Sequence, residues 1–225
     1  MRQALAGETV VRKLESRSLM YVPNDPGPHP VLCFLHGVGE AAADREGRQP
    51  QLLTKVLEHR SPGWHAENAT PFVSRFLVIC PQLDRQRRWE PADAEWVDTL
   101  VSHAIRDHGG DQSRLVLTGF SYGGEGTFQL VGASRFHWST IWAVDPAIQR
   151  TTPKPAADVR VWIHYGNQQP GRENMAAFSE DLGLEPFSGN KVARRLVTAL
   201  DEDHVGTCVA AYATAEVYDW LVSRP

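Results

Sequence analysis

Ser121 and His204 are the two side chains whose types and settings most strongly suggest chemistry. Ser121 is the centre of residues 119–123 (GFSYG), which match the pattern G-x-S-x-G. In that pattern the serine occupies a sharp, strained turn between a strand and a helix, and its hydroxyl is exposed there. The apolar run 115–118 precedes the turn and a helical pattern follows it. We therefore expect a serine that a neighbouring base can activate for attack on a carbonyl carbon.

His204 is the expected base, because it lies between the last expected strand and the last expected helix. An imidazole titrates near neutrality, so it can take the serine proton and return it to a leaving group. Nine histidines are present, and position is what selects this one. For His36 and His164, which also lie near strand ends, we expect structural hydrogen bonds. The histidines and cysteines show no metal-ligand spacing, so we expect no metal. Acyl transfer by a serine and a histidine needs no cofactor, and we expect none.

Two backbone N–H groups are expected to hold the negative oxygen that forms during acyl transfer. One follows the nucleophile, which makes it the N–H of Tyr122, and the other comes from a loop after an earlier strand. Residues 36–40 (HGVGE) follow such a strand, and Val38 lies between two glycines that let the backbone turn. Residues 37–42 also fit a loose dinucleotide-binding fingerprint, but that alternative leaves Ser121 unexplained.

Apolar patterns predict the elements that position these groups. Strands are expected at 18–22, 31–35, 76–80, 115–118, 140–144, 159–164 and 195–200, and helices near 52–57, 96–105, 123–131, 175–182 and 209–222. We expect Asp93 to cap the second of these helices and Gly109 to end it. Strands that alternate with helices predict a mostly parallel central sheet with helices on both faces. In such sheets, ligands bind at the carboxyl ends of the strands.

Length and composition bound the class of protein. The chain has 225 residues, a formal net charge of −4 and three cysteines. We expect a single domain over 1–225, with Cys33 and Cys80 as buried free thiols in strands. The charge does not favour a nucleic-acid partner. No stretch reads as a signal peptide or as a membrane span, which predicts a cytoplasmic protein, either a monomer or a homodimer.

With these residues placed, the chain resembles the esterase/phospholipase-carboxylesterase branch of the α/β-hydrolases, which includes "predicted peptidases" and polyhydroxybutyrate-depolymerase-like proteins. The resemblance is carried by residues 35–40 (LHGVGE), Pro81-Gln82 followed by Trp89, 111–124 (DQSRLVLTGFSYGG), 212–213 (YA) and 216–221 (EVYDWL). It implies the α/β-hydrolase fold without a large cap domain. It also implies a serine mechanism that needs no cofactor.

The acid of the expected triad is the main departure from that family. The resemblance implies an aspartate shortly after His164-Tyr165-Gly166, where this chain has Gln168 and Gln169. Three alternatives are open: an acid moved to Asp145 after the strand 140–144, an acid from a nearby loop (Glu173, Asp201 or Asp203), or no carboxylate, with a glutamine orienting the imidazole. Of these we predict Asp145.

These residues predict a serine carboxylesterase acting on small soluble esters through a Ser-His-Asp acyl-enzyme mechanism. The segment 58–71, with Trp64, is expected to form a loop that lines an open cleft. Trp89 is expected either to form a wall of the substrate pocket or to pack in the interior. Two other functions stay open: a peptidase or amidase on the same machinery, and a catalytically impaired binding protein, which the two glutamines would suggest.

Overall fold

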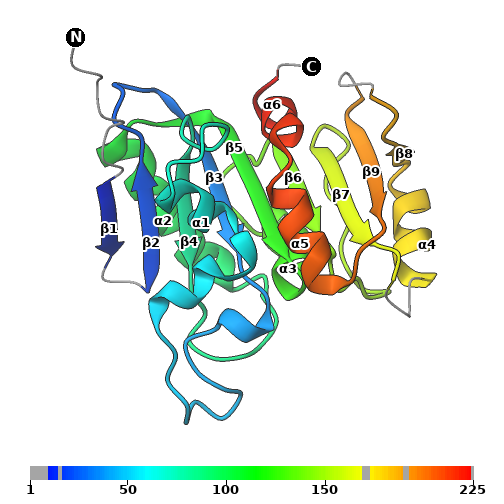
Figure 1. Cartoon of the computed structure of the whole chain (residues 1–225), viewed down its shortest axis with the longest axis horizontal. Coiled ribbons are helices and arrows are strands. Elements are labelled where there is room, and N and C mark those ends of the chain that lie inside the picture. The colour runs from blue at the N-terminus through cyan, green and yellow to red at the C-terminus, as the bar shows by residue number, and fades with distance from the viewer. Residues whose placement is uncertain (1–9, 15–16, 169–172, 190–192, 224–225) are drawn as a thin grey trace.

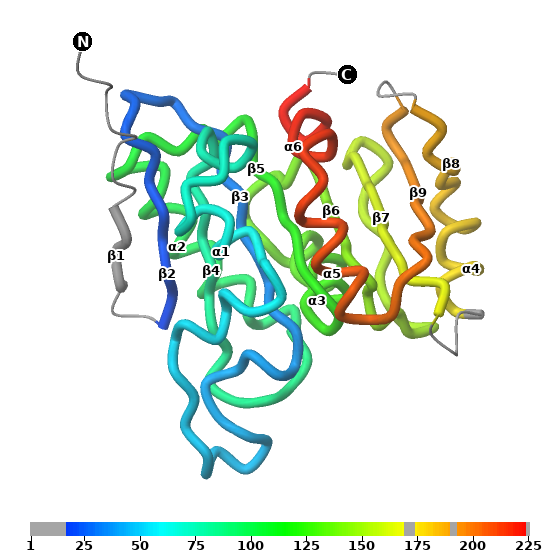
Figure 2. Tube along the Cα trace, in the orientation of Figure 1, coloured from blue at the N-terminus to red at the C-terminus, as the bar shows by residue number. Residues whose placement is uncertain are grey.

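A computed structural model describes residues 10–14, 17–168, 173–189 and 193–223. In this part of the chain nine strands form one sheet, in the order β1-β2-β4-β3-β5-β6-β7-β9-β8 (Figure 1, Figure 2). The strands are β1 Val10–Leu14, β2 Ser18–Val22, β3 His29–Leu35, β4 Leu77–Pro81, β5 Gly110–Phe120, β6 Thr140–Val144, β7 Arg160–Gly166, β8 Glu185–Pro186 and β9 Arg195–Leu200. β2 pairs antiparallel with both β1 and β4, and every other neighbouring pair is parallel.

The helical elements cover both faces of this sheet. They are the 3₁₀ segments η1 Val38–Glu40 and η2 Leu53–Arg60, and the α-helices α1 Pro62–Glu67, α2 Asp93–His108, α3 Tyr122–Val131, α4 Glu173–Asp181, α5 His204–Tyr212 and α6 Ala215–Val222. In Figure 1, α1, α5 and α6 lie in front of the sheet, and α2 and α3 lie behind it. The expected mostly parallel sheet between two helical layers is confirmed.

The core is divided by the sheet because successive strand side chains point to opposite faces. Along β3, Leu32 and Phe34 pack in the cluster that includes residues of α5 and α6. Val31 and Cys33, between them in sequence, pack in the cluster that includes residues of α2. A continuous apolar run such as the one in β3 is therefore typical of a strand that is covered by helices on both faces of the sheet.

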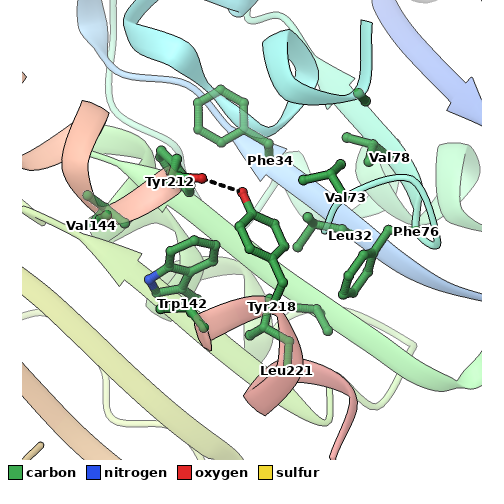
Figure 3. Close-up of a cluster of buried hydrophobic side chains, with 14 of the residues drawn as sticks. Leu32, Phe34, Val73, Phe76, Val78, Trp142, Val144, Tyr212, Tyr218 and Leu221 are labelled. Carbon is green, nitrogen blue, oxygen red and sulfur yellow. Dashed lines mark hydrogen bonds between the residues drawn. The ribbon is translucent and has the colours of Figure 1, made fainter. Parts of the chain in front are cut away.

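Aromatic rings join the two C-terminal helices to the front face, as Figure 3 shows. Trp142 of β6 meets Tyr218 of α6 edge to face, with ring centroids 5.2 Å apart. The Tyr218 hydroxyl donates a hydrogen bond of 3.0 Å to the carbonyl oxygen of Tyr212 at the end of α5. The buried phenol is thus satisfied by the neighbouring helix, and α6 is held against α5 and the sheet together.

The strands match their sequence patterns closely. Those expected at 18–22, 140–144 and 195–200 have the bounds predicted for them, and β5 is longer than expected because it begins at Gly110. The short edge strands β1 and β8 were not predicted. All three cysteines, Cys33, Cys80 and Cys208, are free and buried, as expected for the two in strands.

Three helical predictions need correction. The segment expected as an α-helix at 52–57 is the 3₁₀ segment η2, which kinks where His59 adopts a φ of 56°. The expected loop 58–71 contains the helix α1, which Ser61 caps by accepting a hydrogen bond from the Trp64 N–H. The long helix expected at 209–222 is two helices, separated at Ala213 and Thr214, and the first of them already begins at His204.

The start of α2 also differs from the expectation. Asp93 is the first helical residue, not the cap, and the cap position is held by Ala92. The Asp93 carboxylate accepts a hydrogen bond of 2.8 Å from the N–H of Glu90, ahead of the helix. Gly109 ends α2 with a φ of 72°, as predicted. No helix in the described ranges has the length and apolar character that crossing a bilayer requires.

Candidate active site

The register of β5 and β6 brings Ser121 and Asp145 together. Phe120 pairs with Val144 across the two strands, so the residues that follow them leave the sheet side by side. Ser121 donates its backbone N–H to the carbonyl oxygen of Val144 at 3.0 Å. Both Ser121 and Asp145 have positive φ, 57° and 42°, an unfavourable conformation for residues other than glycine. The segments that follow β5 and β6 therefore both turn sharply at the same edge of the sheet.

Glycines make the turn at Ser121 possible. A Cβ on Gly119 would overlap the backbone of Gly123, and a Cβ on Gly123 would overlap the carbonyl group of Leu35. The start of α3 thus lies directly against the ends of β3 and β5. This is the strand–turn–helix context that residues 119–123 predicted.

His204 completes a hydrogen-bonded chain of three side chains. It is the first residue of α5, which Asp203 caps. Its Nε2 lies 2.9 Å from the Ser121 Oγ, and its Nδ1 lies 2.5 Å from the Asp145 Oδ2. The side chain of Asp145 is 1% exposed and that of His204 is 36% exposed. The carboxylate of Asp145 is therefore buried deep in the protein, and the imidazole of His204 is open to solvent.

The second oxygen of Asp145 is held by the backbone. Its Oδ1 accepts a hydrogen bond of 3.0 Å from the N–H of Gly166, at the end of β7. The N–H of Asp145 donates to the carbonyl oxygen of His164 at 2.7 Å. Because β7 is the strand beside β6, the sheet itself fixes the direction in which this carboxylate points.

The other residues considered for the acid have different partners. Gln168 donates its side-chain amide to the backbone carbonyl of Asp201 at 3.1 Å. Asp203 accepts a hydrogen bond of 2.7 Å from the N–H of Gly206, as a helix cap does. Gln169 lies outside the described residues, and so does the side chain of Glu173. Of the carboxylates proposed from sequence, Asp145 is the one in contact with His204.

The loop after β3 lies against the nucleophile turn. The position that a Cβ on Gly37 would take is 3.4 Å from the Cβ of Ser121. Val38 is the first residue of η1 directly after this contact, and Tyr122 is the first residue of α3. The N–H groups at the start of a helix have no partner within it. The two groups expected to hold an oxyanion thus belong to segments that flank Ser121.

Trp89 and His36 brace this loop from behind. The Trp89 indole N–H donates to the carbonyl oxygen of His36 at 3.0 Å, and Trp89 is 1% exposed. His36 Nε2 accepts the N–H of Leu83 at 2.9 Å, and its Nδ1 donates to the carbonyl oxygen of Gly37. Burial lowers the pKa of His36, consistent with this neutral tautomer. Trp89 is therefore a packing residue, and the prediction that it forms a pocket wall is corrected.

His164 is structural, as expected. Its Nδ1 accepts the indole N–H of Trp142 at 3.1 Å inside the sheet layer. Complete burial lowers the pKa of His164 to about 3, so the ring stays neutral. The ring therefore serves the packing of the sheet layer.

Glu40 and His59 form an ion pair near the site that the sequence did not predict. The ring of Phe120 contacts the rings of both His204 and His59, with centroid distances of 4.5 Å and 5.8 Å. His59 Nε2 is 3.1 Å from Oε1 of Glu40, which is buried. The hydrogen bond to Glu40 raises the pKa of His59. Burial raises the pKa of Glu40, but the hydrogen bond to His59, the charges of His36 and His59 and a backbone hydrogen bond together outweigh this, and the net shift is downward.

These two residues, with Glu58, form the one group of three possible metal ligands in the described part of the chain. Their ligand atoms lie within 4.8 Å of one another. However, the ammonium group of Lys55 lies 2.5 Å from Oε1 of Glu58, and His59 already pairs with Glu40. Two ion pairs account for this group, and we assign no metal to it.

Arg88 is a second charged neighbour that the sequence did not single out. Its guanidinium carbon lies 4.2 Å from the centre of the Tyr122 ring. One of its nitrogens lies 3.4 Å from the buried carboxylate of Glu125 and 3.3 Å from the carbonyl oxygen of Ala147. Three arginines lie among residues 85–88, and the sequence does not distinguish between them. Only the fold shows which of them reaches the nucleophile turn.

Comparison with known proteins gives likeness in structure alone. No protein-family model matches the sequence, and no curated protein matches it. A thermostable esterase of known structure superposes with a TM-score of 0.66 at 18% sequence identity, over 91% of this chain and 57% of that one. This chain therefore spans little more than half the length of that esterase.

Two further solved structures match over nearly their whole length. An S-formylglutathione hydrolase from Agrobacterium tumefaciens has a TM-score of 0.60 and 14% identity, over 95% of this chain and 93% of that one. The fluorophosphonate-binding serine hydrolase F of Staphylococcus aureus also has a TM-score of 0.60, at 12% identity, over 96% and 98% of the two chains. Together with the strand order and the layers described above, these likenesses show that the chain has the α/β-hydrolase fold.

Proposed function

We propose that this protein is a serine hydrolase that cleaves small carboxylic esters. The observation that carries the proposal is the chain of contacts from the Ser121 hydroxyl through His204 to the Asp145 carboxylate. With Nδ1–H donated to the carboxylate, Nε2 of the imidazole has its lone pair directed at the serine proton. Asp145 then orients the ring and stabilises the imidazolium that forms.

The reaction follows from these roles. His204 takes the proton of Ser121, and the serine oxygen attacks the ester carbonyl carbon. The tetrahedral intermediate collapses when the imidazolium returns that proton to the alcohol, which leaves an acyl group on Ser121. Water, activated by the same imidazole, then releases the acid. No cofactor takes part in these steps.

We assign the oxyanion hole to the backbone N–H groups of Val38 and Tyr122. The contact between Gly37 and Ser121 supports this assignment, because it brings the loop after β3 to the nucleophile. The N-terminus of α3 adds a partial positive charge on the same side. Removal of one such donor from other enzymes lowers kcat by about 10²- to 10³-fold.

The proposal of a small ester as substrate is supported by the elements of the fold that surround the site. Between β3 and β4 the chain contains η1, η2 and α1, which are short elements and do not amount to a cap domain. Two of the similar structures are described as an esterase and an S-formylglutathione hydrolase. The intact contact between His204 and Asp145 weighs against a catalytically impaired binding protein. The same groups would also serve amide cleavage, which remains the alternative reaction.

Hydrolysis of p-nitrophenyl acetate and p-nitrophenyl butyrate tests the proposal. We expect turnover by the wild type and a loss on the order of 10⁶-fold in Ser121→Ala. Ser74→Ala removes an exposed hydroxyl that binds only the carbonyl oxygen of Pro71 and should behave as the wild type. A fluorophosphonate probe should label the wild type and Ser74→Ala but not Ser121→Ala. If neither ester is cleaved faster than by Ser121→Ala and no label is taken up, the proposed function is wrong.

A further inference from the structure

Two histidines converge at the C-terminal end of α2, at the far end of β5 from Ser121. His103 Nε2 and His108 Nε2 lie 3.3 Å apart, and the two rings are nearly perpendicular, with an interplanar angle of 89°. Both side chains are partly exposed. Two ring nitrogens thus lie within hydrogen-bond distance of each other on partly exposed side chains.

The separation of these nitrogens fits a shared metal ion. Zinc binds imidazole nitrogen at about 2.0–2.1 Å in tetrahedral geometry, which places two such nitrogens about 3.3 Å apart. With no metal present, the pair can share a single proton between the two Nε2 atoms. A bound ion would replace that one hydrogen bond with two coordination bonds and would not require the rings to move far.

Asp107 prepares His103 for this role. Its Oδ2 lies 2.5 Å from Nδ1 of His103, so the proton of a neutral His103 is held on Nδ1 and the Nε2 lone pair faces His108. Metal-binding histidines almost always have their other nitrogen held in this way. His108 is the last residue of α2, where the partial negative charge of a helix C-terminus favours a cation.

We propose that His103 and His108 form a binding site for a borderline divalent ion of the zinc class. Their two Nε2 atoms are the ligands, Asp107 is a positioning residue, and water completes the coordination. The group formed by Glu40, Glu58 and His59 is less suited, because the Nε2 of its one histidine is already paired with Glu40. Imidazole ligands prefer zinc, copper or nickel to magnesium. We therefore expect the site to bind zinc and not magnesium.

Titration of metal-free protein tests the proposal. Isothermal calorimetry with ZnCl₂ should show one ion per chain, and the melting temperature should rise with zinc because the ion binds the folded state. His103→Gln and His108→Gln should each abolish this binding. Asp107→Asn should weaken it by about 10- to 100-fold, as loss of such a partner does. MgCl₂ should produce neither heat nor a shift in melting temperature.

Two histidine variants serve as matched controls. His137→Gln changes an exposed histidine near a single carboxylate, that of Asp158, and His59→Gln changes the other candidate group. Both should bind zinc as the wild type does, and circular dichroism without metal checks that every variant is folded. The proposal is overturned if the wild type binds no zinc, if His103→Gln and His108→Gln keep the wild-type affinity, or if magnesium binds equally well.

Discussion

Asp145 directs its carboxylate from a backbone conformation that few residues other than glycine adopt. Its φ is 42°, and the turn it makes after β6 lets one oxygen reach His204 while the other stays on the N–H of Gly166. An amide in its place could keep the second contact but would favour the wrong tautomer of the imidazole. The charge and the geometry of this side chain can therefore be separated by experiment.

Asp145→Asn should lower kcat for p-nitrophenyl butyrate by about 10⁴-fold, which is the effect of the same change in a characterised triad. Asp203→Asn is the control, because Asp203 lies next to His204 in the chain and its carboxylate caps α5. It should keep kcat within a few fold and lose at most about 1 kcal/mol of stability. A near wild-type rate in Asp145→Asn would remove Asp145 from the proposed mechanism.

The Glu40–His59 pair should make stability depend on pH. Folding raises the pKa of His59 above 6.5, so this contribution is complete below pH 6.5 and is lost as the pH rises through the folded value. Folding lowers the pKa of Glu40 below 4.5, so its contribution is present above pH 4.5 and is lost as the pH falls through the folded value. Both contributions to stability, that of His59 and that of Glu40, are therefore present together between about pH 4.5 and pH 6.5.

The melting temperature of His59→Gln should therefore fall furthest below that of the wild type near pH 6, and the gap should narrow by about pH 9. Glu40→Gln should show the same trend. Scanning calorimetry of the three proteins across this range measures it. A gap that stays constant with pH would mean that the pair contributes through packing and not through charge.

At the scale of elements, the join of β5 to α3 depends on a missing side chain. Gly123→Ala would force a methyl group into the carbonyl of Leu35. We expect a loss of about 1–3 kcal/mol, typical of overpacking, together with lower activity because the turn must shift. Gly132→Ala, at the end of the same helix, meets no atom within 4 Å and has an ordinary φ of −82°. It should be neutral or stabilising by up to about 1 kcal/mol.

Urea unfolding monitored by circular dichroism gives both values. Equal stability of the two glycine variants would show that α3 can move away from β3 without cost. That result would contradict the tight junction described here.

The elements that could be predicted from sequence are those whose pattern has one physical cause. β3 and β6 are buried on both faces, so continuous apolar runs identify them. α2 has a clear 3.6-residue period and ends at Gly109, which adopts a left-handed conformation. By contrast, no glycine or proline marks the break between α5 and α6, where Ala213 and Thr214 simply leave helical geometry. The kink in η2 likewise occurs at His59, a residue that rarely adopts positive φ.

The candidate site was predictable in part for a related reason. Ser121 and His204 each have a local signal, namely the glycines around one and the strand–helix boundary before the other. Asp145 has only its place after the strand 140–144 as a signal, because its partner is 59 positions away in the chain and the strand order β6-β7-β9 brings them together. The contacts of Arg88 and of the pair formed by Glu40 and His59 likewise all cross between elements.

At the scale of the whole molecule, α6 closes the front layer over the sheet. Leu221 is 4% exposed and lies in the same cluster as Trp142 and Tyr218 (Figure 3). Leu221→Ala should cost about 2–5 kcal/mol. Leu52→Ala is the matched control, because Leu52 is 75% exposed and its loss should change stability by no more than about 0.5 kcal/mol. Thermal unfolding of the two variants separates these cases, and similar melting temperatures would show that α6 contributes little to the core.

The positive φ of Ser121 lowers the stability of the folded protein, while the serine hydroxyl at this position is needed for the proposed reaction. The conformation costs an ordinary residue about 1–3 kcal/mol, and glycine would relieve it while removing the hydroxyl on which the proposed reaction depends. If mutant libraries of this protein were sorted by heat resistance alone, glycine at this position would be enriched. The survivors would include proteins that fold better than the parent and cleave nothing. Directed evolution of this chain therefore has to score product formation in every round.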